Sequence, residues 1–156
     1  MGNRAVITTE DNFNNNGIGI YLHWNGGYDS VDAFLKYAKF RGVRSPLSDP
    51  SYFWSRLSQI IGNYFGGNLS VGINCVNNLD CDNFDNGVYI IDDNFNIVDR
   101  KYYEGEEQTE YPLADMLASI DKAQPEGSKL KDTLKEWNGD YFVLAESPDD
   151  YRGQEW

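Results

Sequence analysis

The chain has 156 residues, enough for one domain with its own core, and its 40% hydrophobic and 15% aromatic content argues against intrinsic disorder. No apolar run of about 18 residues and no charged-then-apolar leader is visible, so we expect a cytoplasmic protein rather than a membrane or secreted one. The net charge of -12 disfavours direct binding to nucleic acid or to an anionic membrane.

The charge is unevenly distributed along the chain. Residues 1–60 hold six basic and five acidic side chains, whereas residues 61–156 hold seven and twenty. One interpretation is that the acidic half only keeps the protein soluble. The other is that an acidic face docks onto a basic groove of a partner protein, including a groove built for nucleic acid. The candidate residues for this face are Asp80, Asp82, Asp85, Asp92, Asp93, Glu104, Glu106, Glu107 and Glu110.

The first elements predict an antiparallel hairpin. The β-branched composition of Arg4–Thr9 and of Ile18–Leu22 is typical of strands. Asn and Asp residues in Glu10–Asn16 tolerate left-handed backbone, which favours a turn between the two strands. The second strand therefore delivers His23 and Trp24 to its end.

Two helices are expected next. Apolar residues at helical spacing predict a helix over about residues 29–41, opened by Asp29 or Ser30. A more aromatic helix is predicted over about residues 50–65, and its apolar face is expected to lie in the core.

The second half predicts further strands and one or two helices. In chain order we expect a strand over Leu69–Cys75, a polar loop over Asn77–Gly87 and a hairpin of Val88–Ile91 and Phe95–Val98 that extends toward Lys101–Tyr103. An acidic connection over Glu104–Glu110, helices near 112–123 and 129–137, an edge strand over Tyr141–Leu144 and a mobile tail over 147–156 follow. The sequence thus predicts a single α+β domain over residues 1–156, with a mixed or mainly antiparallel sheet of about five strands and three to four helices packed on it.

The turn between the second strand and the first long helix is the best candidate for a ligand site. A strand end that runs through Gly26 and Gly27 into a helix exposes backbone amides that suit an anion. The stretch lacks the lysine of a phosphate-binding P-loop, and Asp29 would oppose an anion there, so an ordinary turn into a capped helix is the alternative interpretation. The candidate ligand-binding residues are Arg4, His23, Trp24, Asn25, Gly26, Gly27, Tyr28 and Ser30.

The sequence offers little support for catalysis or metal binding. His23 is a candidate general base, but no nucleophile elbow or spaced acidic pair accompanies it, so no catalytic residue is assigned. The spacing of Cys75 and Cys81 does not match a zinc site; free thiols are favoured over a disulfide between them. The acidic loop fails the EF-hand pattern because a ligand position falls on Phe84. We therefore expect neither a metal ion nor a cofactor.

Four segments together resemble a family of small, largely uncharacterised acidic proteins from phages, prophages and other mobile elements: Gly2–Ile7 (GNRAVI), Ile20–Gly27 (IYLHWNGG), Asp29–Leu35 and Asp85–Ile91 (DNGVYII). The resemblance covers about residues 2–103 and assigns no catalytic residue. It implies the context of a mobile element, in which small acidic proteins often inhibit host defence.

Three hypotheses follow. The first is a non-enzymatic phage inhibitor of bacterial antiviral defence that binds a host defence protein, such as a CRISPR effector, through the acidic face in the cytoplasm of the infected host. The second is a sponge that sequesters a small nucleotide immune signal at the turn from His23 to Gly27, with a homo-oligomer as one arrangement. The third and weakest is a nucleotide-processing enzyme that uses His23.

Overall fold

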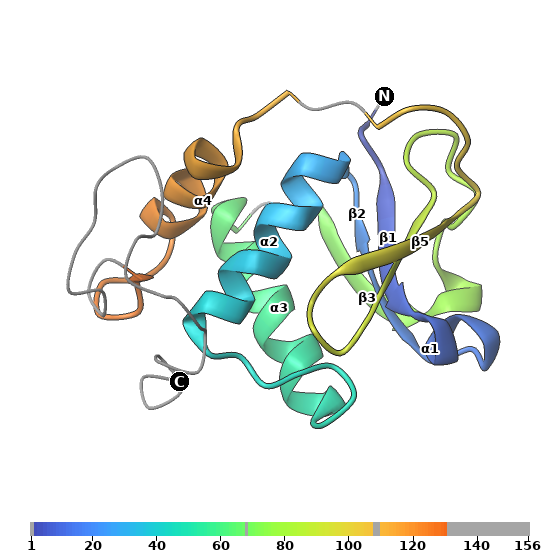
Figure 1. The fold of residues 1–156 in the computed structure, drawn as a ribbon, viewed down its shortest axis with the longest axis horizontal. Helices are drawn as coiled ribbons and strands as arrows, with labels where there is room; N and C mark the ends of the chain where they lie inside the picture. The colour runs from blue at the N-terminus through green and yellow to red at the C-terminus, as the bar shows by residue number, and fades with distance from the viewer. Residues whose placement is uncertain (1, 68, 108–109, 131–156) are drawn as a thin grey trace.

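The computed structural model describes residues 2–67, 69–107 and 110–130, and it has a five-stranded mixed sheet with helices packed on it (Figure 1). The elements in chain order are β1 (Ala5–Thr9), α1 (Glu10–Asn14), β2 (Ile18–Leu22), α2 (Tyr28–Arg41), α3 (Pro50–Tyr64), β3 (Val71–Cys75), the short 3-10 helix η1 (Val76–Asn78), β4 (Val88–Ile91), β5 (Ile97–Lys101) and α4 (Leu113–Lys122). The α+β fold class is confirmed. The strand expected over Tyr141–Leu144, the tail over 147–156 and nearly all of the helix over 129–137 lie outside the described residues.

The strand order is β3-β2-β1-β4-β5. β1 pairs with β2 in antiparallel register, so the N-terminal hairpin is confirmed, and β1 pairs with β4 in parallel register. The pairs β2–β3 and β4–β5 are antiparallel. As a consequence, the starts of β1, β3 and β4 and the ends of β2 and β5 all lie at one end of the sheet.

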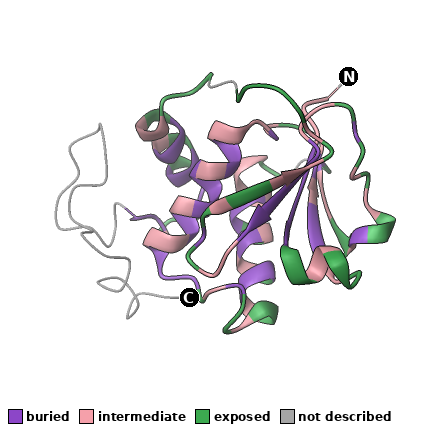
Figure 2. Ribbon diagram, turned by 45° about the vertical axis from the view of Figure 1, so that its right-hand side comes forward, coloured by how far each residue is buried: buried purple, intermediate pink, exposed green. Residues whose placement is uncertain are grey.

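The two faces of the sheet bury different sets of side chains, because successive residues of a strand point to opposite faces. Ile7 and Ile20 belong to the larger core, which also contains the apolar faces of α2, α3 and α4. Val6 and Val88 belong to a smaller cluster on the other face, where Phe13 of α1 packs against it. Figure 2 shows the buried residues concentrated in the strands and in the helix surfaces that face them.

The segment Glu10–Asn16 differs from its prediction, because α1 occupies most of the expected turn. The hydroxyl of Thr9 caps α1 by accepting a hydrogen bond from the backbone N–H of Asn12 at 3.2 Å. The side chain of Asn12 then donates to the carbonyl oxygen of Ile18 at 3.2 Å. These local side-chain bonds favour one helical turn over a simple loop, and the hairpin closes around it.

The long helices match their predictions to within a few residues. α2 ends before Gly42, whose φ of 86° places it in the left-handed region that favours glycine at this position. α3 begins at Pro50, and the carboxylate of Asp49 accepts from the backbone N–H of Tyr52. Within the described residues, none of the helices has the length and apolarity needed to cross a membrane.

Candidate functional site

The candidate site lies at the sheet end where β1, β3 and β4 start and β2 and β5 finish. Three of the connections at this end form the site: the loop before β4, the turn from β2 to α2 and the segment after β5. In Figure 1 this end lies at the top, beside the N-terminus.

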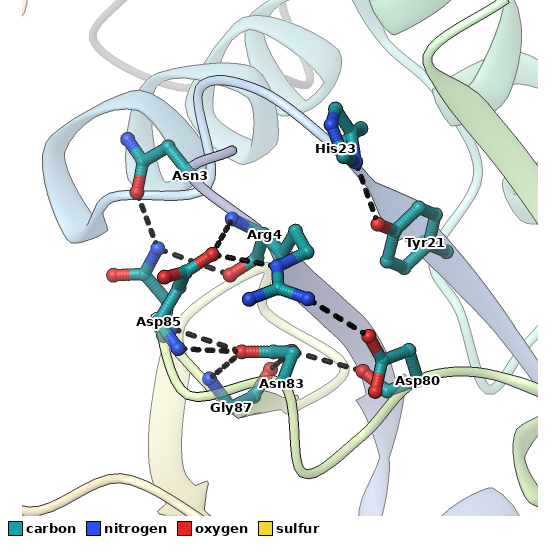
Figure 3. Close-up of polar contacts among 9 residues, drawn as sticks. Asn3, Arg4, Tyr21, His23, Asp80, Asn83, Asp85 and Gly87 are labelled. Carbon is teal, nitrogen blue, oxygen red and sulfur yellow. Dashed lines mark hydrogen bonds and ion pairs between the residues drawn. The ribbon is translucent and has the colours of Figure 1, made fainter. Parts of the chain in front are cut away.

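The loop before β4 is organised around the side chain of Asn83, which is fully buried. Its Oδ1 accepts hydrogen bonds from the backbone N–H groups of Asp85, Asn86 and Gly87 at 3.1, 3.1 and 3.0 Å. Its Nδ2 donates to the carbonyl oxygens of Asp80 at 2.9 Å and Gly87 at 3.2 Å (Figure 3). One side chain thus fixes five backbone groups, and the loop is held in one conformation.

Phe84 in this loop combines an exposed aromatic side chain with a left-handed backbone conformation. Its side chain is 90% exposed, and its backbone φ of 61° lies in the left-handed region, which is costly for a residue other than glycine. The bonds around Asn83 hold this conformation, so the ring is displayed on a rigid support.

Arg4 at the start of β1 is tied to the same loop. Its Nε donates to Oδ2 of Asp85 at 2.8 Å, and its Nη1 lies 3.4 Å from Oδ2 of Asp80. Although burial raises the pKa of Asp85, the hydrogen bonds from Arg4 outweigh this effect and hold the pKa below its ordinary value. Arg4, predicted as an anion partner, is therefore already engaged by two carboxylates.

His23 and Trp24 stand beside this cluster on the end of β2. Nδ1 of His23 lies 2.9 Å from the hydroxyl of Tyr21, and the rings of His23 and Trp24 meet edge to face at 5.0 Å. Figure 3 shows the imidazole directed at Tyr21 rather than at the loop. His23 is half-buried and Trp24 is 44% exposed.

Asn25 and Gly26 hold the turn between β2 and α2 in place through hydrogen bonds and a close backbone approach. The side chain of Asn25 donates to Ser30 Oγ at 3.4 Å. Gly26 is buried, its N–H donates to the carbonyl oxygen of Asn3, and its own carbonyl accepts from the hydroxyl of Tyr89 at 2.6 Å. A Cβ at Gly26 would lie 2.4 Å from the Asn3 carbonyl oxygen, so the chain passes too close for any side chain.

The start of α2 differs from the prediction that Asp29 or Ser30 caps it. α2 begins at Tyr28, and Gly27 is the N-cap without a side-chain cap bond. Asp29 instead lies in the first turn, where Oδ1 accepts from the N–H of Ser30 at 2.7 Å. Its Oδ2 accepts from the backbone N–H groups of Glu110 and Tyr111 at 2.6 and 2.7 Å, which ties the segment after β5 to this helix start.

A cavity of about 350 Å³ opens between these parts. Four acidic side chains and four aromatic rings line it, together with polar and backbone groups: Asp29, Asp85, Glu107, Glu110, Tyr28, Phe84, Tyr103, Tyr111, Asn3, Gly27, Ser30 and Asn86. Of the predicted ligand-binding residues, Gly27, Tyr28 and Ser30 line this cavity. Arg4, His23, Trp24, Asn25 and Gly26 are not among its lining residues.

Arg100 of β5 contacts three of the residues that line the cavity, Tyr103, Glu107 and Asn86. Its guanidinium lies between the rings of Tyr89 and Tyr103, 4.0 and 3.8 Å from their centroids. It also pairs with Glu107, and its Nη2 donates to the carbonyl oxygen of Asn86 at 2.6 Å. The cation–π contact with Tyr103 and the ion pair with Glu107 hold the segment after β5 on Arg100, and the hydrogen bond to Asn86 ties Arg100 to the loop before β4.

The predicted acidic face is divided by the structure. Seven of its nine members lie in the segments that meet at this end of the sheet, and Asp29 joins them; we call this set the acidic end: Asp29, Asp80, Asp82, Asp85, Glu104, Glu106, Glu107 and Glu110. Asp92 and Asp93 lie at the opposite end, in the turn between β4 and β5. There Asp92 accepts from the backbone N–H groups of Asn94 and Asn96, and Asp93 accepts from that of Leu47. Asp92 therefore closes the turn between β4 and β5, and Asp93 ties this turn to the connection between α2 and α3. A charge count along the sequence cannot reveal these roles.

Cys75 and Cys81 are free thiols, and burial raises the pKa of Cys81. No group of three or more His, Cys, Asp or Glu side chains within residues 2–67, 69–107 and 110–130 is arranged to hold a metal ion.

Sequence reasoning missed Asn83, Arg100 and the rings of Phe84, Tyr103 and Tyr111. One signal was present, because Phe84 is a large apolar residue inside a mostly polar loop.

Comparison of the chain with protein-family models, with curated proteins and with solved structures finds no significant match.

Proposed function

We propose that this chain is a non-enzymatic inhibitor from a phage or another mobile element, which binds a host antiviral defence protein such as a CRISPR effector in the infected cell's cytoplasm. The contact is made by the acidic end. One observation carries the proposal: the cavity beside α2 is lined by both carboxylates and aromatic rings. Such a lining favours an organic cation, and arginine or lysine side chains are the cations that a protein surface offers.

The exposed rings at this end add contact area that charge alone would not supply. Phe84 and Tyr111 on the cavity wall are 90% and 46% exposed, and Tyr102 nearby is 58% exposed. Rigidly held aromatic residues are typical of the few positions that dominate binding energy at protein interfaces. Phe84 is the strongest candidate, because its loop is fixed by Asn83 before any partner arrives.

The charges also favour a basic partner over a nucleotide signal. A phosphate in this cavity would meet Asp29, Glu107 and Glu110, while the nearby Arg4 is paired with Asp85 and Asp80. His23, on which the enzyme hypothesis depends, lies outside the cavity lining and has Tyr21 as its side-chain partner. Mass spectrometry of small molecules released by heating the purified protein tests the alternative, because a bound nucleotide would support the sponge.

A binding experiment tests the proposal directly. The full chain is immobilised, and purified CRISPR effectors are passed over it at low and at high salt. We expect at least one effector to be retained at low salt and its association rate to fall as salt rises, because screening weakens attraction between oppositely charged surfaces.

Matched charge variants make the test specific. Glu104, Glu106 and Glu110, each changed to glutamine, remove three charges from the acidic end, and we expect binding to weaken. Asp11→Asn, Asp115→Asn and Glu126→Gln remove the same number of exposed charges elsewhere and should leave binding unchanged. Equal effects of the two triple variants, or no retention of any effector at any ionic strength, would contradict the proposal.

A further inference from the structure

The outer edge of β3 is an unprotected sheet edge. Within the described residues, β3 and β5 are the two edge strands of the sheet. β5 carries Asp99, Arg100 and Lys101, and a register shift interrupts its pairing with β4, so charge and irregularity protect that edge. β3 has the sequence Val-Gly-Ile-Asn-Cys, without charge, proline or a register shift against β2. Edges of this kind invite pairing with another strand.

The hydrogen bonds between β2 and β3 show which backbone groups of β3 face outward. The carbonyl oxygen of Ser70 accepts from His23 N–H, and Val76 N–H donates to the carbonyl oxygen of Gly17. Because such pairs alternate in an antiparallel ladder, Ser70, Gly72, Asn74 and Val76 direct their backbone groups to β2. Val71, Ile73 and Cys75 therefore direct theirs to the free edge, although the N–H of Cys75 is taken by the side chain of Asn74 at 2.7 Å.

The surroundings of this edge are electrically neutral, which is unusual for a chain of net charge -12. From Pro50 to Leu79, through α3 and β3, Arg56 is the only charged residue. Ile73 is 47% exposed and Leu69 is 99% exposed. We call this strip, β3 with the adjoining face of α3, the neutral edge.

An apolar groove of about 540 Å³ runs along the neutral edge between α3 and β3. Ile18, Trp54 and Ile73 are its apolar walls, and serines of α3 border it. Trp54 is 95% buried, and no hydrogen-bond partner for its Nε1 is found among the described residues. The groove therefore offers apolar area to an incoming chain.

We propose that the neutral edge binds a second copy of this chain, with the two β3 strands antiparallel about a two-fold axis at Ile73. Ile73 then donates its N–H to the carbonyl oxygen of the partner's Ile73 and accepts the reciprocal bond, as the closely bonded pair of an antiparallel ladder requires. The two five-stranded sheets become one continuous sheet.

Charge selects a second copy as the occupant. Two chains of net charge -12 repel one another except where both surfaces are neutral, and the neutral edge provides such a surface. Antiparallel pairing also directs the two acidic ends to opposite ends of the joined sheet. The same pairing sets the partner's Val71 opposite Cys75 and brings the partner's Leu69 toward the groove, which gives the exposed Leu69 an apolar neighbour.

Sedimentation velocity of the full chain from low to high micromolar concentration tests the proposal. We expect a species of twice the 17.8 kDa chain mass that dissociates on dilution. Ile73→Lys places two like charges directly opposite one another on the axis, and we expect it to raise the dimer dissociation constant at least about tenfold. Val98→Lys, at a 58% exposed position on the protected edge strand β5, is the matched control and should leave the constant unchanged.

A disulfide across the axis gives a second readout that does not depend on weakening the dimer. Cα atoms of a closely bonded antiparallel pair lie about 5.5 Å apart, within the range that a disulfide spans. In a Cys75→Ser, Cys81→Ser background, Ile73→Cys should form a covalent dimer on mild oxidation, whereas Val98→Cys should not. A chain that stays monomeric throughout, or a dimer that resists Ile73→Lys and fails to cross-link, would overturn the proposal.

Discussion

Replacing Asn83 with alanine would remove the side chain on which the loop before β4 depends. Five hydrogen bonds are lost, but Asn86 N–H keeps the carbonyl oxygen of Arg4, and the Gly87 carbonyl keeps the N–H of Val6. Three backbone groups therefore lose their partner: the N–H groups of Asp85 and Gly87 and the carbonyl of Asp80. At about 1 kcal/mol for each net hydrogen bond, the free energy of unfolding should fall by about 3 kcal/mol.

For a chain of this length, a loss of this size corresponds to a fall in Tm of about 6 to 12 °C. Urea unfolding followed by circular dichroism measures the free energy, with Asn94→Ala as the control. Asn94 is exposed, and its recorded bond to Asp92 uses the backbone N–H, so this variant should stay within about 0.5 kcal/mol of the natural chain. A change below about 1 kcal/mol for Asn83→Ala would refute the view that this side chain holds the loop.

Three further substitutions test the site. Phe84→Gly should raise the free energy of unfolding by about 1 kcal/mol, because glycine adopts the left-handed backbone without strain, while partner binding in the proposed assay is lost. Asp85→Asn should make the urea midpoint fall less steeply as the pH is lowered. The pKa of Asp85 is lowered in the fold, so its ionised carboxylate stabilises the fold fully above the ordinary pKa of 3.8, and this stabilisation is lost as pH falls through the lowered pKa. Gly26→Ala should cost about 2 kcal/mol in unfolding free energy because its Cβ would meet the Asn3 carbonyl, whereas Gly62→Ala, inside α3 with open space around it, should gain about 0.5 to 1 kcal/mol.

Each of these has a result that would count against it. A destabilised Phe84→Gly would mean that the ring packs rather than binds. If the urea midpoint of Asp85→Asn falls at acid pH as steeply as that of the natural chain, the ion pair with Arg4 does not contribute to stability. Similar unfolding midpoints for Gly26→Ala and Gly62→Ala would mean that the close approach at Gly26 relaxes freely.

The helices and the N-terminal hairpin were predictable because their signals are local. α2 carries apolar residues at helical spacing and ends before Gly42, and the strand residues Ile7 and Ile20 alternate with residues of the opposite face. The helix α1 was missed because two side-chain hydrogen bonds decide the conformation of this short, polar segment. The hydroxyl of Thr9 caps the helix, and the side chain of Asn12 donates to the carbonyl oxygen of Ile18.

The candidate site was only partly predictable because it joins segments that are far apart in the chain. The turn at Gly27 and the acidic residues were identified, but their meeting depends on the parallel pairing of β1 with β4, for which no local pattern exists. The position of Arg100 between Tyr89 and Tyr103 likewise depends on the register of β4 against β5. Residue types indicated acidity, and only the strand order decided which acidic residues share a surface.

The parallel pairing of β1 with β4 also bears on how fast the protein folds. Val6 lies beside Val88, so the central ladder of the sheet closes a loop that contains β2, β3, α2 and α3. Contacts between residues so far apart in the chain give a high contact order. Because closing such a loop costs chain entropy before its contacts form, we expect the protein to fold more slowly than other proteins with as much helix. During synthesis on the ribosome, the side of β1 that pairs with β4 would stay without its partner strand until β4 emerges. The hairpin of β4 and β5 would then complete the sheet last.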